Sequence, residues 1–185
     1  MRYTAAVITV SDKCSRGERE DTSGPMLCTL LAQNECEVVH RALVPDEKEQ
    51  IQAVIRHAAD ELRVQLILTT GGTGFSPRDI TPEATAELIE RATPGLPELM
   101  RGESCKITPR GCLSRGIAGI RGSSLIVNLP GGTQIIPHDV SQRLAGGQTG
   151  NVYVTVQGNM IGDEAYADYM GNVVAQRLLR ALRNT

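Results

Sequence analysis

The fold is decided near the middle of the chain by QLILTTGGTG, residues 65–74. Residues 65–70 are mostly apolar or β-branched, a pattern typical of a short buried strand in a parallel sheet. Glycines follow directly, and further on Thr81 and Pro82 stand where the N-cap and first turn of a helix are expected. This stretch therefore predicts a strand, a glycine loop and a helix in succession.

The same alternation continues on both sides of this stretch. Apolar runs predict strands at residues 5–10, 37–43 and 124–129, and helical patterns fall at residues 25–33, 47–62 and near 95–102. Such alternation predicts an α/β fold with three layers, in which an open, mostly parallel sheet carries helices on both faces. Ligands bind such sheets at the carboxyl ends of the strands, so we expect one crevice between the loops at 11–24, 71–79 and from residue 130 onward.

Composition narrows the class of protein. Of 185 residues, 41% are apolar and only 3% aromatic, which suits a sizeable core of branched aliphatic side chains. A formal net charge of -2 argues against a nucleic-acid partner, because binding a phosphate backbone requires clustered Lys and Arg on the protein surface. No apolar run approaches the roughly 20 residues that span a bilayer, and no signal-peptide pattern is seen, so we expect no membrane contact and a cytoplasmic protein. Five cysteines without a CxxC pair predict neither a disulfide framework nor a zinc site.

The glycine loop is a candidate phosphate-binding segment. Gly71, Gly72, Thr73 and Gly74 follow a strand, where a glycine backbone can approach a ligand closely and point its N–H groups at a phosphate. A plain turn explains these glycines equally well. The run lacks the Gly-Lys-Ser/Thr of a nucleotide P-loop, so a P-loop NTPase is excluded.

Two carboxylates stand near strand ends and could share a Mg²⁺ ion. Asp46 and Asp79 suffice in number, because one or two carboxylates together with substrate phosphates hold Mg²⁺. Structural alternatives stay open for both: Asp46 with Glu49 fits a capping box, and Asp79 fits an Asx-type turn before Thr81. Arg78 offers a charged donor for a phosphate.

A second group of polar residues lies near the expected end of the last strand. Ser114, Arg115 and Asn128 supply hydroxyl, guanidinium and amide donors that suit an anion or a polar heterocycle. Structural turns explain them as well.

Six motifs in order carry a family resemblance. The chain closely resembles the molybdopterin-binding, Mog-like and MoaB-like family from its first strand to Gly131. The motifs are Thr9-Val10-Ser11-Asp12 with Asp21-Thr22-Ser23-Gly24-Pro25, Pro45-Asp46, residues 70–83 (TGGTGFSPRDITPE), Pro94-Gly95-Leu96, Leu113-Ser114-Arg115, and residues 126–131 (IVNLPG).

The resemblance implies an adenylyltransferase that uses Mg²⁺ and ATP. Family members adenylylate molybdopterin, so the terminal phosphate of the pterin would attack the α-phosphate of ATP and expel pyrophosphate. Such transfers depend mainly on positioning and charge neutralisation. By similarity, Asp46 and Asp79 are the expected catalytic and metal-binding residues, and Gly71, Gly72, Thr73 and Gly74 would line the nucleotide phosphates. The expected border of the pterin and its phosphate is Ser11, Ser114, Arg115, Pro130 and Gly131. A homotrimer and a molybdenum-insertion partner are also implied.

The resemblance ends after Gly131. The family usually continues with a Ser/Asn/Gln-Pro-Lys-like turn, whereas this chain reads GTQIIP at residues 132–137. We expect a Mog-like domain at residues 1–136 and an atypical segment at 137–185 that ends in a helix at 164–183, packed on the same domain or at a subunit contact. The main alternative function is a non-catalytic molybdopterin-binding or carrier protein of the MoaB-like type. A scaffold role and a nucleotide pyrophosphate hydrolase are the others.

Overall fold

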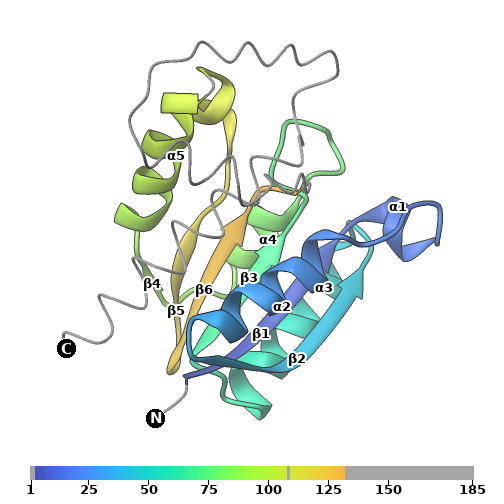
Figure 1. The fold of residues 1–185 in the computed structure, drawn as a ribbon, viewed down its shortest axis with the longest axis vertical. Coiled ribbons are helices and arrows are strands. Elements are labelled where there is room, and N and C mark those ends of the chain that lie inside the picture. Colours follow the sequence, from blue (N-terminus) through green and yellow to red (C-terminus); the bar gives the residue numbers. More distant parts are fainter. Residues whose placement is uncertain (1–2, 108, 132–185) are drawn as a thin grey trace.

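The computed structural model describes residues 3–107 and 109–131, which form a sheet with helices on both faces (Figure 1). The sheet has the strand order β2-β1-β3-β6-β5-β4. Its strands are β1 Tyr3–Val10, β2 Cys36–Val44, β3 Leu66–Thr70, β4 Arg91–Ala92, β5 Ala118–Arg121 and β6 Ser124–Leu129. β2, β1, β3 and β6 run parallel, while β5 and β4 are antiparallel to their neighbours. The predicted three-layer α/β fold with a mostly parallel sheet is confirmed.

The helices follow the strands as the sequence pattern predicts. They are α1 Asp12–Ser15, α2 Ser23–Gln33, α3 Lys48–Arg56, α4 Thr81–Ala86 and α5 Gly95–Ile107, with a π-helical turn at His57–Glu61 and a 3-10 turn at Pro109–Leu113. The helices expected at 25–33, 47–62 and near 95–102 are confirmed within a few residues. The polar stretch 11–24 is not all loop, because it contains α1 and the start of α2.

Alternate residues of β1 point to opposite faces of the sheet, and each face has its own apolar core. Ala5 and Val7 pack with residues of α2 and α5, whereas Ala6, Ile8 and Val10 pack with residues of α3 and α4. Both cores are built mainly from Val, Ile, Leu and Ala, as the scarcity of aromatic residues predicts. The central strands are therefore buried on both sides, which holds their carboxyl ends in fixed positions.

Two local predictions are wrong. The N-cap of α4 is Ile80, and no side chain makes a capping bond there. Thr81 is the first helical residue, and its N–H donates to the carbonyl of Gly72. The helical pattern at 47–62 predicts that Leu62 lies on the same apolar stripe as Ile51 and Ile55. Leu62 is instead 42% exposed, because it lies just past the π-helical turn.

The structure bears on the expectations about cysteines and membrane-spanning helices, but not on those about the C-terminal segment. The five cysteines are free thiols. Within residues 3–107 and 109–131, no helix has the length and apolar character needed to cross a membrane. The helix expected at 164–183 and the departure after Gly131 lie outside the described residues.

Candidate active site

Two aspartates clasp each other where β1 and β2 end. The N–H of Asp12 donates to Asp46 Oδ2 at 2.8 Å, and the N–H of Asp46 donates to Asp12 Oδ1 at 3.1 Å. β1 and β2 are parallel neighbours, so their carboxyl ends deliver these residues to the same edge. Asp12 was not among the predicted site residues, although it stands beside Ser11 in the motif Thr9-Val10-Ser11-Asp12 that carries the family resemblance.

The carboxyl group of Asp46 is buried and lacks a direct cationic partner among the described residues. It is 8% exposed, and burial raises its pKa, to which the nearby charges of Asp12 and Asp79 add. The hydrogen bond from Asp12 and the charge of Arg78 oppose that rise. A cation placed beside a buried carboxylate stabilises its ionised form.

The capping box predicted for Asp46 is wrong. Glu47 is the N-cap of α3, and no side chain makes a capping bond there. Asp46 stands one residue too early, and its carboxylate accepts from Asp12 of another loop. The capping explanation for Asp46 is thereby removed, and its Oδ2 instead joins the end of β1 to the end of β2.

Arg78 links the glycine loop to this corner. Its guanidinium donates to Asp12 at 3.0 and 2.9 Å and to Glu47 Oε1 at 2.8 Å. The pKa of Asp12 is lowered chiefly by its hydrogen bond from Arg78. Arg78, predicted as a phosphate donor, is therefore engaged within the protein by the carboxylates of Asp12 and Glu47.

The glycine loop passes close to Asp46 because two of its residues have left-handed backbone angles. Gly71 has φ of 101° and Gly72 has φ of 62°. A Cβ on Gly71 would lie 2.1 Å from the carbonyl oxygen of Val10, and one on Gly72 would lie 2.8 Å from Asp46 Oδ1. Only glycine fits either position.

The glycine loop presents backbone donors. Gly71 uses its N–H on the carbonyl of Leu129, at 3.2 Å. The N–H groups of Gly72, Thr73 and Gly74 bond no residue in the described ranges, so they are available to an anion.

Asp79 holds its own loop. Its Oδ2 accepts from the N–H of Ser76 at 2.8 Å, and its own N–H donates to the carbonyl of Ser76 at 2.9 Å. This carboxylate thus closes the turn behind it instead of forming the predicted Asx-type turn ahead of it. Its Oδ1 makes no hydrogen bond to any described residue, which leaves one oxygen for a ligand.

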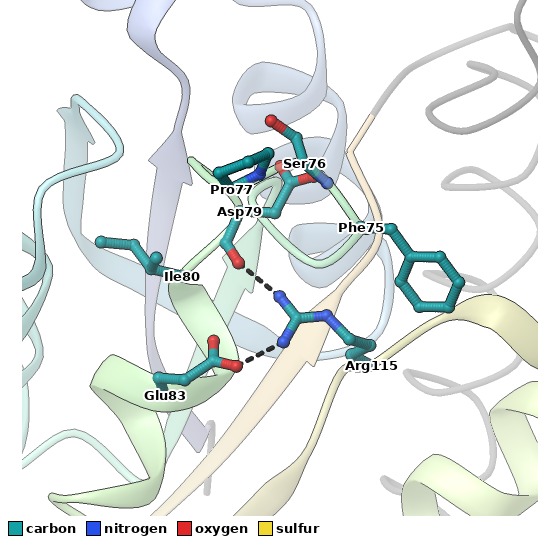
Figure 2. A pocket seen from close by; sticks show the side chains of 7 residues that line it. All are labelled: Phe75, Ser76, Pro77, Asp79, Ile80, Glu83 and Arg115. Carbon is teal, nitrogen blue, oxygen red and sulfur yellow. Dashed lines mark hydrogen bonds and ion pairs between the residues drawn. The ribbon is translucent and has the colours of Figure 1, made fainter.

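Arg115 ties the same loop to α4, as Figure 2 shows. Its Nε donates to the carbonyl of Gly74 at 2.7 Å, and its two terminal nitrogens contact the carbonyl of Asp79 and the carboxylate of Glu83. Three of the five guanidinium N–H donors are used in this way. Sequence reasoning missed Glu83, whose carboxylate is the acidic partner of Arg115.

An open hollow of about 450 Å³ lies beside the contacts that Arg115 makes with Gly74, Asp79 and Glu83, which we call the Arg115 clamp. It is lined by Phe75, Ser76, Pro77, Asp79, Ile80, Glu83 and Arg115 (Figure 2). The side chain of Phe75 is 56% exposed and points away from Asp79 (Figure 2).

The remaining predicted residues frame the loops. Ser11 caps α1 by accepting from the N–H of Cys14 at 3.3 Å, and Ser114 Oγ accepts from the N–H of Gly116 at 3.4 Å. The carbonyl of Pro130 accepts from Thr70 Oγ1 at 3.0 Å, and a Cβ on Gly131 would lie 2.9 Å from Gly71 Cα. The end of β6 is thus packed directly against the glycine loop.

The donor set fits a divalent cation that is held jointly with a ligand. In the described part of the chain, no group of three or more His, Cys, Asp or Glu side chains is arranged to hold a metal ion by itself. Asp46 Oδ1 and Asp79 Oδ1 each accept no hydrogen bond from a described residue, and Mg²⁺ is commonly held by one or two carboxylates plus substrate phosphates.

Comparisons with known proteins agree in sequence and in fold. A family profile described as "Probable molybdopterin binding domain" matches residues 6–137. The chain is 44% identical over 128 residues to the molybdopterin adenylyltransferase of Helicobacter pylori strain J99, covering 68% of this chain and 72% of that protein. It is 46% identical over 134 residues, 72% of its length, to the molybdenum cofactor synthesis protein cinnamon of Drosophila melanogaster, but spans only 22% of that longer protein.

Solved structures give the same fold over most of the chain. The molybdopterin biosynthesis enzyme MoaB of Thermus thermophilus aligns with a TM-score of 0.74 at 38% identity, covering 99% of this chain and 98% of that one. The tungsten cofactor synthesizing protein MoaB of Pyrococcus furiosus aligns with a TM-score of 0.72 at 26% identity, covering 99% and 96%.

Proposed function

The chain belongs to the family of the probable molybdopterin binding domain, and on that premise we propose that it transfers an adenylyl group from Mg-ATP to molybdopterin. An oxygen of the terminal phosphate of molybdopterin attacks the α-phosphorus of ATP. The new P–O bond forms as the bond from the α-phosphorus to the bridging oxygen breaks, and pyrophosphate leaves with that electron pair. The products are adenylylated molybdopterin and pyrophosphate.

One observation carries this proposal beyond the similarity to named adenylyltransferases. The glycine loop brings Gly72 against Asp46. Backbone N–H groups and a carboxylate oxygen that bond no described residue therefore lie close together. Transfer between phosphates depends on holding anionic groups in line and neutralising their charge, and no covalent nucleophile is needed. Backbone donors and a carboxylate-held cation together meet that demand.

We assign the roles as follows. Asp46 and Asp79 hold the cation, which supplies charge neutralisation for the phosphates when it is bound. The backbone of residues 71–74 receives the nucleotide phosphates, with the N–H groups of Gly72, Thr73 and Gly74 as donors. The proposed border of the pterin and its phosphate is Ser11, Ser114, Arg115, Pro130 and Gly131. Arg115 acts there mainly through the loop that it holds.

The assembly around this site is also proposed. We infer a cytoplasmic homotrimer in which residues 1–136 form the catalytic domain and residues 137–185 pack on it or on a neighbouring subunit. A protein that inserts molybdenum would receive the adenylylated product.

The test is pyrophosphate release from ATP by the full-length protein. We expect release that requires both molybdopterin and Mg²⁺ and stops when the metal is chelated. Binding of molybdopterin without any pyrophosphate would contradict the proposal and indicate a carrier protein. Phosphate release from nucleotides in the absence of pterin would indicate a hydrolase instead.

A further inference from the structure

A buried hydroxyl group beside the glycine loop has no hydrogen-bond partner. Thr81 is fully buried, and its Oγ1 is one of three buried side-chain polar atoms without a partner among the described residues. Thr70 donates to the carbonyl of Pro130, and Thr69 and Thr85 both accept from Asn128. Since buried hydroxyl groups are normally paired, the unpaired hydroxyl of Thr81 requires an explanation.

The unpaired oxygen faces the same space as Asp46. A Cβ built on Gly72 would lie 2.3 Å from Thr81 Oγ1 and 2.8 Å from Asp46 Oδ1. Both oxygens therefore lie on the same side of Gly72, the side on which any other residue would carry its Cβ. Neither oxygen bonds another described residue. The N–H of Thr81 donates a hydrogen bond to the carbonyl of Gly72 at 3.1 Å, which fixes the two segments against each other.

We propose that Thr81 Oγ1 is, together with Asp46 Oδ1, a direct ligand of the divalent cation that accompanies the nucleotide. This inference rests on the proposed function and adds a ligand to its cation site. A hydroxyl oxygen is a neutral hard donor of the kind that Mg²⁺ accepts. It completes a carboxylate site without adding a further negative charge.

Electrostatics favours a cation over a phosphate oxygen at this point. A phosphate against Thr81 Oγ1 would stand beside the ionised carboxylate of Asp46 and be repelled, whereas a cation between two oxygens is attracted to both. Arg78 cannot serve as that cation, because its guanidinium is bound to Asp12 and Glu47.

The test uses Mn²⁺ as a spectroscopic substitute for Mg²⁺ and measures binding rather than turnover. Free Mn²⁺ is followed by electron paramagnetic resonance in the full-length protein with a non-hydrolysable α,β-methylene analogue of ATP. Thr81→Val removes the hydroxyl at constant shape, and we expect Mn²⁺ to bind roughly ten-fold more weakly. Thr81→Ser returns an oxygen and should recover most of that affinity.

Thr85→Val is the matched control, because Thr85 is a fully buried threonine on the same helix whose hydroxyl does have a partner. Its loss breaks a 3.0 Å hydrogen bond from Asn128, so the Tm should fall while Mn²⁺ affinity is retained. Thr81→Val breaks no hydrogen bond in the free protein, so its Tm should be unchanged or higher.

Two results would overturn the inference. One is equal Mn²⁺ affinity in Thr81→Val and the unaltered protein. The other is an equal loss of nucleotide affinity with and without the cation, which would make Thr81 a phosphate contact. Both are measured apart from pyrophosphate release, so failure here is distinguishable from failure of the proposed function.

Discussion

Replacing Arg115 with alanine should release the loop that carries Asp79 while leaving the fold intact. Arg115 is the only described side chain that bonds the carbonyls of both Gly74 and Asp79, which stand near the two ends of that loop. Arg115→Lys keeps the charge, but a single ammonium group cannot reproduce the planar fork that reaches two carbonyls. We therefore expect both variants to fail in the same way.

The free energy lost in Arg115→Ala is estimated from the three contacts that its guanidinium makes. Arg115 is 32% exposed and Glu83 is 51% exposed, so their ion pair contributes little after solvent screening. The two bonds to backbone carbonyls contribute about 1 kcal/mol each. A loss of about 2 kcal/mol shifts the ratio of closed to open loop by about 30-fold.

Amide hydrogen exchange at Ser76 and Asp79 measures this ratio, because each N–H is bonded within the loop. Exchange at both should rise by up to about 30-fold, and kcat/KM for pyrophosphate release should fall to the extent that the closed form of the loop is depopulated.

Arg121→Ala provides the control. Arg121 binds Asp60 and the carbonyl of Leu88 in a similar manner, but on β5 at the opposite end of the sheet from the site. It should change neither exchange at Ser76 and Asp79 nor turnover. Unchanged exchange in Arg115→Ala would show that the loop keeps its shape without the clamp and would refute the reasoning.

Three further predictions concern the carboxylates and the glycine loop. Asp79→Asn retains an acceptor for Ser76 but removes the charge, so pyrophosphate release should be abolished with the Tm preserved; measurable turnover would contradict this. Burial raises the pKa of Asp46, so its ionised form costs stability in the metal-free protein, and the cost grows as pH rises above the ordinary value of 3.8. Asp46→Asn should therefore unfold at a higher temperature than the unaltered protein near pH 7, with the difference vanishing below pH 3.8. Gly72→Ala should lose both stability and cation affinity, whereas Gly17→Ala, at φ of 72° with open space around it, should lose only about 1–2 kcal/mol of stability from backbone strain.

The sequence predicts the parallel half of the sheet well because burial on both faces leaves a continuous apolar pattern. β1, β3 and β6 all show it. β5 shows no such pattern, since Gly119 lies inside it, where a Cβ would meet the side chain of Ile89 at 2.4 Å. A strand that needs a glycine for close packing carries little apolar signal of its own.

The sequence suggests which carboxylates lie near each other at the candidate site, but not which side chains bond them. The charge of Asp79 acts on Asp46, so the two carboxylates lie near each other as expected, while their roles stay predictions. The comparisons place the chain in the family that the motifs suggested. The partners of Arg78 and Arg115 could not be predicted, because they come from segments distant in sequence. A local pattern also favoured a capping box for Asp46, and a hydrogen bond from Asp12 replaced it.

The clasp between Asp12 and Asp46 has a consequence for the order of folding. Its two residues are 34 positions apart, whereas Arg78 is 66 positions from Asp12. Closing the longer loop costs more chain entropy and must wait for β3 to dock beside β1. The clasp can therefore form in an early unit made of β1, α2 and β2, while the cation site matures only when the central strand arrives. During refolding, Mn²⁺ binding should report the last steps of assembly, after most secondary structure is already present.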